Sequence, residues 1–177
     1  SNNGKILKKV ILDFTKRIDL EIAQWIKKEV HFPCTMVDGI VPNNIKKSKD
    51  FDLNYEDNAL VVSEPYKEWY IESKNVHLKE ILSNNKIKFV DDVSFYENIK
   101  LKILNASHSA LSYIGLLLGY SYVHEAINDK DCYNFILNFL DKEVLPTIQL
   151  KYSFNINNYK FNVLNRFKNI FIADKLE

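Results

Sequence analysis

Residues 100–124 read KLKILNASHSALSYIGLLLGYSYVH, and we expect the rest of the chain to fold around this stretch. Apolar residues recur in it at one-turn and two-turn spacings, and no acidic or basic residue lies between His108 and His124. A helix with this pattern is buried on most sides. The uncharged run is shorter than the roughly 18 to 20 residues that a membrane span needs. The pattern therefore predicts a buried helix of a globular domain.

Three polar side chains lie near the start of this helix. At about 100° per residue, Lys100, Asn105 and His108 fall within an arc of about 140°, so they can line one pocket. Lysine, amide and imidazole groups suit the oxidation of a secondary alcohol by hydride transfer. A buried lysine can accept the hydroxyl proton, an amide can stabilise charge on the oxygen, and a neutral imidazole can orient the hydroxyl.

This chemistry predicts Lys100 as the general base, Asn105 as the group that stabilises the oxyanion, and His108 as the group that orients the substrate. The spacing K-x4-N-x2-H also occurs by chance, and a lysine near a helix start is more often simply solvated. Spacing alone therefore leaves the catalytic and the structural interpretations open.

Residues 96–125, YENIKLKILNASHSALSYIGLLLGYSYVHE, resemble the signature region of the polyol-specific long-chain dehydrogenases. In that family the lysine, asparagine and histidine of K-x4-N-x2-H are catalytic, and they fall on Lys100, Asn105 and His108. The resemblance implies a zinc-independent oxidoreductase that uses NAD or NADP, and no metal site is expected.

Residues 31–42, HFPCTMVDGIVP, have no usable period and are expected to form a loop or a short extended segment. They resemble the family's F-P-x-[ST]-M-V-D-R-I-x-P segment, which implies that Asp38 binds a substrate hydroxyl and that Val37 lines the nicotinamide ring. The chain departs from the family at Gly39, where an arginine is usual. Without the resemblance, Asp38-Gly39 is an ordinary turn.

Ser94 and Glu97 form a predicted capping box, in which the Glu97 carboxylate reaches back to the helix start. That structural role is sufficient reason for a glutamate. In the resembled family, a glutamate three residues before the catalytic lysine relays the proton to solvent, and Glu97 occupies that place. The two roles are compatible, because a capping carboxylate can still exchange protons through water.

The predicted fold class is mainly α (α+β): a helical domain around a long buried helix (about 95–127) with a small sheet. Periodicity predicts helices over residues 5–16 and 20–29, with Asp19 as the N-cap of the second. Composition predicts strands over residues 59–63, 68–73 and 86–90. The whole chain, residues 1–177, is expected to form a single domain.

Charge and cysteine content narrow the partners. The chain has 24 basic and 23 acidic residues, a balance that gives no footprint for nucleic acid. Its two cysteines lack the spacing of a metal site or a disulfide framework, which favours a cytoplasmic protein. We expect no nucleic-acid partner and no membrane.

None of the four glycines forms a G-x-G-x-x-G loop, so we expect no Rossmann domain in this chain. The resemblance, from Asn3 to about Asp174, then implies an incomplete C-terminal catalytic domain. On this interpretation NAD or NADP binds mainly to an absent N-terminal nucleotide-binding domain, which is the expected partner, and the isolated chain is inactive.

The function implied by the resemblance is a polyol dehydrogenase of the mannitol 2-dehydrogenase type, which converts a sugar alcohol and NAD to a ketose and NADH. Two alternatives remain. One is a fructuronate or tagaturonate reductase acting on a hexuronate, since the P-C-T-M-V-D and I-V-P pieces also suit that branch. The other is a truncated, non-catalytic helical remnant that serves at most as an interaction domain.

Overall fold

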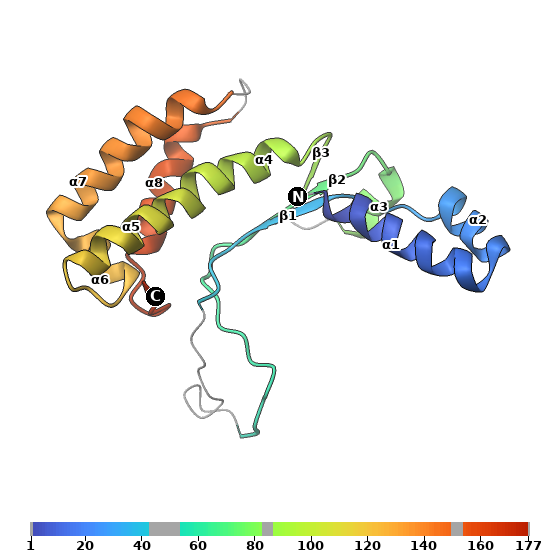
Figure 1. The fold of residues 1–177 in the computed structure, drawn as a ribbon, viewed down its shortest axis with the longest axis horizontal. Coiled ribbons are helices and arrows are strands. Elements are labelled where there is room, and N and C mark those ends of the chain that lie inside the picture. The colour runs from blue at the N-terminus through green and yellow to red at the C-terminus, as the bar shows by residue number, and fades with distance from the viewer. Residues whose placement is uncertain (1, 43–53, 83–86, 150–153, 177) are drawn as a thin grey trace. The chain divides into compact units, whose positions relative to one another are not determined.

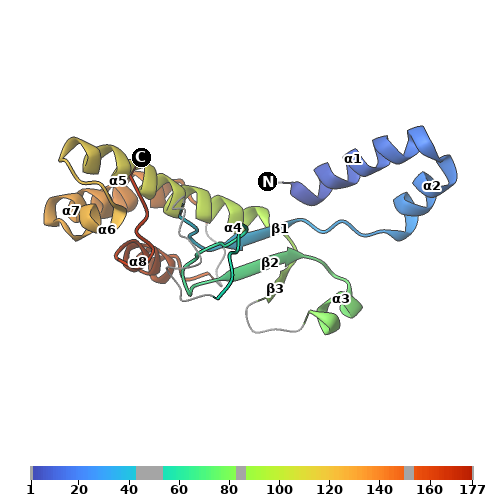
Figure 2. The same ribbon diagram turned by 90° about the horizontal axis from the view of Figure 1, so that it is seen from below.

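The computed structural model describes residues 2–42, 54–82, 87–149 and 154–176. The chain divides into two compact units. Unit 1 comprises residues 1–38 and 67–98, and unit 2 comprises residues 39–66 and 99–177. Figures 1 and 2 show the elements of each unit.

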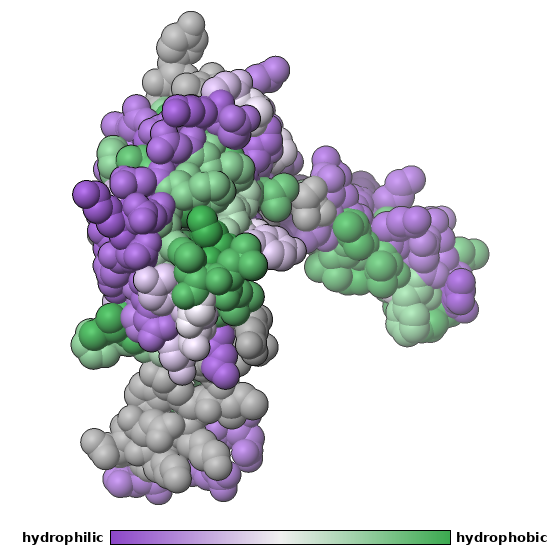
Figure 3. All heavy atoms as spheres, turned by 60° about the vertical axis from the view of Figure 1, so that its left-hand side comes forward, coloured by the Kyte–Doolittle hydropathy of each residue, from purple (hydrophilic) through white to green (hydrophobic). Residues whose placement is uncertain are grey.

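Unit 1 opens with two helices, α1 (Asn3–Ile18) and α2 (Leu20–Glu29). Both predicted helices are confirmed, and so is the predicted cap: Asp19 Oδ1 accepts hydrogen bonds from the backbone N–H groups of Glu21 at 2.8 Å and Ile22 at 3.1 Å. Their apolar residues are largely exposed, and Figure 3 shows apolar surface along this helix pair. The exposed residues are Ile6, Leu7, Val10, Phe14, Ile18, Leu20, Ile22 and Trp25.

The sheet of unit 1 has three strands in the order β1 (Thr35–Asp38), β2 (Glu68–Glu72) and β3 (Ile87–Val90). β1 pairs antiparallel with β2, and β2 pairs parallel with β3. Parallel neighbours need a crossover connection, and here it includes the short helix α3 (Val76–Ile81). The two later strand predictions are confirmed.

The strand predicted over residues 59–63 is wrong, because these residues form no regular structure. β-Propensity reflects packing against neighbouring strands more than an intrinsic backbone preference, and the described sheet provides no partner for this run. The first strand instead lies within the segment expected to be a loop or short extended piece, residues 31–42. Its Met36 side chain packs in a small cluster with Cys34, Tyr70 and Val93.

The long predicted helix begins as α4 (Ser94–Ile99), continues as a π-helical turn over Lys100–Asn105 and then becomes α5 (Ala106–Leu117). Three helical elements follow: α6 (Val123–Asn128), α7 (Lys130–Phe139) and α8 (Ile156–Phe167). A second π-helical turn (Leu140–Val144) and a 3-10 turn (Leu145–Thr147) extend α7.

The helix ends at Leu117, so the prediction that it continues to about residue 127 is wrong. Gly119 has a φ of 85°, in the left-handed region. The Tyr120 N–H bonds to the Gly115 carbonyl at 2.9 Å, and the Gly119 N–H bonds to the Leu116 carbonyl at 3.1 Å. This pair of bonds is a Schellman motif, which satisfies the last carbonyls of a helix and turns the chain away.

The core of unit 2 lies between α5, α6 and α7, which contact one another, while α6 also contacts α8 (Figure 1). Its fully buried side chains include Ile103, Leu111, Val123, Ile127, Ile136, Leu140, Val163 and Leu164. Within the part of the chain that the structure describes, no helix is long and apolar enough to cross a membrane.

Asp129 organises the start of α7. Its Oδ1 accepts the backbone N–H groups of Asp131 and Cys132, each at 2.9 Å, and its Oδ2 accepts the Tyr120 hydroxyl at 3.1 Å. The Cys132 N–H bond is the largest cause that lowers the pKa of the Asp129 carboxyl, and the carboxylate in turn raises the pKa of Tyr120. The carboxylate form is thus favoured in the folded chain.

We expect replacement of Gly119 by alanine to lower the free energy of unfolding by about 1–2 kcal/mol, because an L side chain is strained at this φ. No atom lies within 4 Å of a Cβ added there, so the loss arises from the backbone alone. Gly119→Asn is the matched control, since asparagine tolerates the left-handed region and should lose less. Urea unfolding measures both, and an equal loss for the two variants would contradict this account.

The depressed pKa of Asp129 predicts a pH dependence of stability. A group whose pKa is lower in the folded state stabilises the fold above its unfolded pKa, about 4 for aspartate, and loses that effect as pH falls through the folded value. The stability difference between wild type and Asp129→Asn should therefore be largest at neutral pH and should shrink below about pH 4. Thermal unfolding across this range tests it, and a difference independent of pH would exclude the charge as the cause.

Candidate functional site

The π-helical turn changes where the three predicted catalytic residues lie. Within it the Ala106 N–H reaches back to the Leu101 carbonyl, an i to i+5 bond. Such a turn advances roughly 80° per residue instead of about 100°. With this correction Lys100, Asn105 and His108 fall within an arc of roughly 60°, less than half of the arc expected for a regular helix. The structure therefore brings the three onto one narrow helical face.

The opposite face of this helix anchors it in the core of unit 2. Ile103 and Leu111 are fully buried, and Ser107 is also inaccessible to solvent. The Ser107 hydroxyl donates to the Ile103 carbonyl and, at 3.1 Å, to the Leu104 carbonyl. A hydroxyl bonded to the preceding turn supports carbonyl groups at the junction where the π-helical turn meets α5. The anchored face leaves Lys100 and His108 half-buried and Asn105 exposed.

His108 has a carboxylate partner that sequence reasoning missed. Its Nε2 lies 3.1 Å from Asp174 Oδ2, and its ring meets the Phe167 ring edge-on, with centroids 5.9 Å apart. The two partners are 66 positions apart, so no local pattern links them. The sequence offered one signal, because the family resemblance extends to about Asp174.

Val37 and Asp38 belong to β1 in unit 1, where adjacent strand residues face opposite sides of the sheet. Asp38 is buried, with 1% of its surface exposed, whereas Val37 is 53% exposed. Val37 is paired with Trp69 of β2, which is also exposed. Together they form an apolar pair on the open side of the sheet, and the contribution of Trp69 to it was not predicted.

Glu97 lies in α4 and is half-buried. Its backbone N–H bonds to the Val93 carbonyl at 3.0 Å, and the Ser94 N–H bonds to Asp92 Oδ1 at 2.9 Å. Asp92 therefore caps the start of this helix. The predicted capping box did not include that aspartate.

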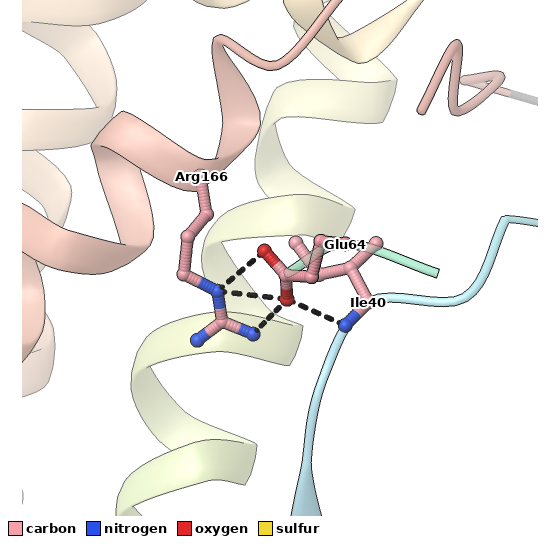
Figure 4. Close-up of polar contacts among 3 residues, drawn as sticks. All are labelled: Ile40, Glu64 and Arg166. Carbon is pink, nitrogen blue, oxygen red and sulfur yellow. Dashed lines mark hydrogen bonds and ion pairs between the residues drawn. The ribbon is translucent and has the colours of Figure 1, made fainter. Parts of the chain in front are cut away.

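A buried ion pair fixes the segment that follows β1. Glu64 Oε1 accepts bonds from the Ile40 backbone N–H and from Arg166 Nη2, both at 2.6 Å, and Arg166 Nε lies 2.9 and 3.1 Å from the two carboxylate oxygens (Figure 4). The side chains of Glu64 and Arg166 are only 2% and 7% exposed. The Tyr66 ring covers the guanidinium, 4.2 Å from Cζ to centroid.

Each unit has an open hollow of ligand size. One in unit 1, of about 460 Å³, is lined in part by Lys5, His31 and Glu72. One in unit 2, of about 380 Å³, is lined in part by Tyr66 and Arg166. Both volumes lie in the range of small-molecule sites. Across the described ranges, no three His, Cys, Asp or Glu side chains are grouped as metal ligands.

Two family models match the chain along almost its whole length. The model of the mannitol dehydrogenase Rossmann domain matches residues 1–84, and that of the mannitol dehydrogenase C-terminal domain matches residues 92–177. The chain belongs to the mannitol dehydrogenase family. The resemblance seen in the sequence is thereby confirmed.

The curated relatives that match this chain are much longer than the chain itself. A polyol:NADP oxidoreductase of Gluconobacter oxydans is 33% identical over 98% of this chain and 36% of its own length. A mannitol 2-dehydrogenase of Pyrenophora tritici-repentis is 33% identical over 98% of this chain and 32% of its own length. The chain thus spans about a third of these relatives.

Solved structures of the family have a similar fold. The Pseudomonas fluorescens mannitol 2-dehydrogenase, in a ternary complex with NAD and D-mannitol, is 35% identical with a TM-score of 0.74. A D-sorbitol dehydrogenase in substrate-free form is 29% identical with a TM-score of 0.81. Each match covers 99% of this chain and 36% or 37% of the other chain.

The expectation that this chain contains no Rossmann domain is wrong, because the Rossmann-domain model of the family matches residues 1–84. That expectation relied on the missing glycine loop, but the loop is only one part of such a domain. The described elements within that match are α1, α2, β1, β2 and α3, whereas β3, the parallel partner of β2, follows it. The prediction that the nucleotide-binding domain lies wholly outside this chain is wrong for the same reason.

The Glu64–Arg166 pair generates a stability prediction. Replacing Glu64 by glutamine should lower the free energy of unfolding by about 3–5 kcal/mol, because it leaves a buried guanidinium without its counter-charge. Glu29→Gln is the control: Glu29 lies 3.1 Å from Lys28 in an exposed pair, and its loss should change stability by less than about 0.5 kcal/mol. Urea unfolding followed by circular dichroism compares them, and similar small losses would count against a structural role of the buried pair.

Proposed function

We propose that the chain contributes the catalytic helix of an NAD(P)-dependent polyol dehydrogenase, which transfers hydride between a sugar alcohol such as mannitol and the matching ketose. Membership of the mannitol dehydrogenase family supports this proposal. The observation that carries it is the π-helical turn, which places Lys100, Asn105 and His108 on one narrow face. A lysine, an amide and an imidazole at these positions suit the oxidation of a secondary alcohol.

In the proposed reaction, Lys100 Nζ accepts the proton of the substrate hydroxyl as the C–H bond breaks. The Asn105 side-chain amide donates a hydrogen bond to the oxygen as that oxygen gains negative charge. His108 binds a neighbouring hydroxyl of the substrate and thereby fixes the orientation of the reacting carbon. When bound, the nicotinamide cofactor supplies the hydride acceptor.

Three further residues have assigned roles in this proposal. Asp38 binds a substrate hydroxyl, a role that the family resemblance of residues 31–42 implies. Glu97 relays the proton taken up by Lys100 to solvent, a role that its half-buried position in α4 permits. Val37 lines the nicotinamide ring.

The described residues fit part of a nicotinamide cofactor. The exposed apolar pair of Val37 and Trp69 offers a flat surface of the kind that an aromatic ring packs against. The sequence has no G-x-G-x-x-G loop for a pyrophosphate. Of the similar proteins, one is named a polyol:NADP oxidoreductase and one was solved with NAD. Activity should therefore be assayed with NAD and with NADP in separate reactions.

The hexuronate branch and a non-catalytic remnant remain the competing functions. Two of the relatives are named for a polyol substrate, which favours a polyol over a hexuronate. Gly39, which stands where the family usually has an arginine, is the departure that favours a non-catalytic remnant. A substrate panel of mannitol, sorbitol, fructuronate and tagaturonate, each with NAD and NADP, separates the branches. Turnover with none of them, even after Gly39→Arg, favours the remnant.

Loss of the general base gives the sharpest test of the proposed function. In the protein that contains this chain, Lys100→Ala should lower turnover of the preferred polyol by a factor of about 100 or more. Lys102→Ala is the matched control from the same turn, because Lys102 Nζ instead donates to the Thr147 carbonyl at 2.9 Å and its hydroxyl at 3.0 Å. Near-normal turnover in the Lys100 variant defeats the assignment.

A further inference from the structure

We propose that Asp174 is the positioning residue for His108, fixing the imidazole so that Nδ1 faces the substrate. Asp174 Oδ2 lies 3.1 Å from His108 Nε2, and the two side chains are 20% and 32% exposed. The catalytic consequence rests on the proposed function of His108. The pairing itself does not, and it can be tested separately.

The chemistry of the two groups decides which ring nitrogen carries the hydrogen. An ionised carboxylate only accepts hydrogen bonds, so the ring nitrogen that faces Asp174 must be an N–H. A neutral imidazole has one N–H, which leaves His108 Nδ1 as an acceptor. His108 Nδ1 then accepts a hydrogen bond from a hydroxyl next to the reacting one, whose own proton goes to Lys100, and this bond fixes the orientation of the reacting carbon.

Backbone bonds on both sides of Asp174 hold this carboxylate in place. The Val123 N–H donates to the Asp174 carbonyl at 2.9 Å, and the Leu176 N–H donates to the Ser121 carbonyl at 3.1 Å. Between them, Tyr122 and Lys175 form an antiparallel bridge. The segment that carries Asp174 is therefore fastened to the start of α6 within unit 2.

Two unfavourable local features accompany the placement of Asp174: a strained backbone at Ala173 and close packing against Gly115. Ala173, directly before the aspartate, has a φ of 49°, which an alanine adopts only at a cost in energy. Leu176 packs so closely on α5 that a Cβ at Gly115 would lie 2.8 Å from its Cδ1. A functional requirement for the position of the Asp174 carboxylate would explain why the chain keeps the strained Ala173 and the closely packed Gly115.

The ring of His108 is restrained from a second direction. The Phe167 ring of α8 meets it at an interplanar angle of 67°. A carboxylate on one edge and an aromatic ring beside it come from different segments, so together they limit rotation of the imidazole. This arrangement is the outer support that keeps a functional side chain in one orientation.

The pairing is tested by nuclear magnetic resonance of the 15N-labelled chain. An imidazole N–H held by Asp174 exchanges slowly with water, so we expect an observable Nε2–H proton of His108 that is lost in Asp174→Ala. Glu80→Ala is the matched control, because it removes the exposed acidic partner that lies 3.6 Å from His77 and should leave the His108 signal unchanged. Persistence of the signal without Asp174 overturns the proposal.

The catalytic role is tested in the protein that contains this chain by combining Asp174→Ala with His108→Ala. Asp174→Ala alone should lower kcat/KM for the polyol roughly tenfold or more, and it should have little further effect once His108 is absent. The proposal is overturned if the effects of the two substitutions on kcat/KM are fully additive. It is also overturned if kcat/KM is unchanged although the N–H signal is lost, because Asp174 would then have only a structural role. Retained turnover in Lys100→Ala defeats the proposed function instead, and leaves the outcome for the pairing to the N–H signal.

Discussion

One extra residue per turn in the helix at Lys100–Asn105 is the constraint on which the candidate site depends. In a regular α-helix, Asn105 and Lys100 would lie about 140° apart, at opposite edges of the arc that contains His108. A π-helical turn, with its i to i+5 hydrogen bonds, is less stable than an α-helical turn and therefore rare, so it persists only where other contacts support it. Buried Ile103 and the bonded Ser107 hydroxyl supply that support. The face that carries Lys100, Asn105 and His108 is thus positioned by side chains on the buried face of the helix.

Much of the local structure could be predicted, because short-range chemistry determines it. Asp19 caps α2 as expected, and two of the three predicted strands form. A capping aspartate acts on N–H groups two and three residues away, so its effect is visible in the sequence. The helical end at Gly119 was also encoded locally, as a glycine after the last apolar turn. It was missed because the apolar run continues beyond it.

Long-range carboxylates could not be predicted in this way. Glu64 meets Arg166 across 102 positions, and Asp174 meets His108 across 66. Lys160, buried in α8, meets Asp141 of the second π-helical turn at 2.5 Å. No period or spacing identifies such partners, which become evident only once the fold brings the segments together. The residues proposed as catalytic were suggested by their spacing and by a family resemblance, whereas their long-range partners required coordinates.

The Rossmann assignment failed for a related reason. A glycine loop is a strong local signal, and its absence was given more weight than the weaker signals of the remaining domain. The α3 helix has only six residues, in a stretch that reads as polar, and is capped by Asn75 Oδ1, which accepts the Leu78 N–H at 3.1 Å. Without that helix the two strands beside it do not suggest a parallel pair. A crossover this short has too little periodicity to be recognised.

The departure at Gly39 can be separated into two effects, a lost charge and a freer backbone. A glycine loosens the chain where it stands, but the next residue is held on both of its polar groups. The Ile40 N–H donates to Glu64 Oε1, and the Ile40 carbonyl accepts the Glu64 N–H at 3.2 Å. Because Arg166 fixes the same carboxylate, the backbone after Gly39 stays anchored within unit 2. What the chain lacks relative to the family pattern at this point is therefore a guanidinium and not rigidity.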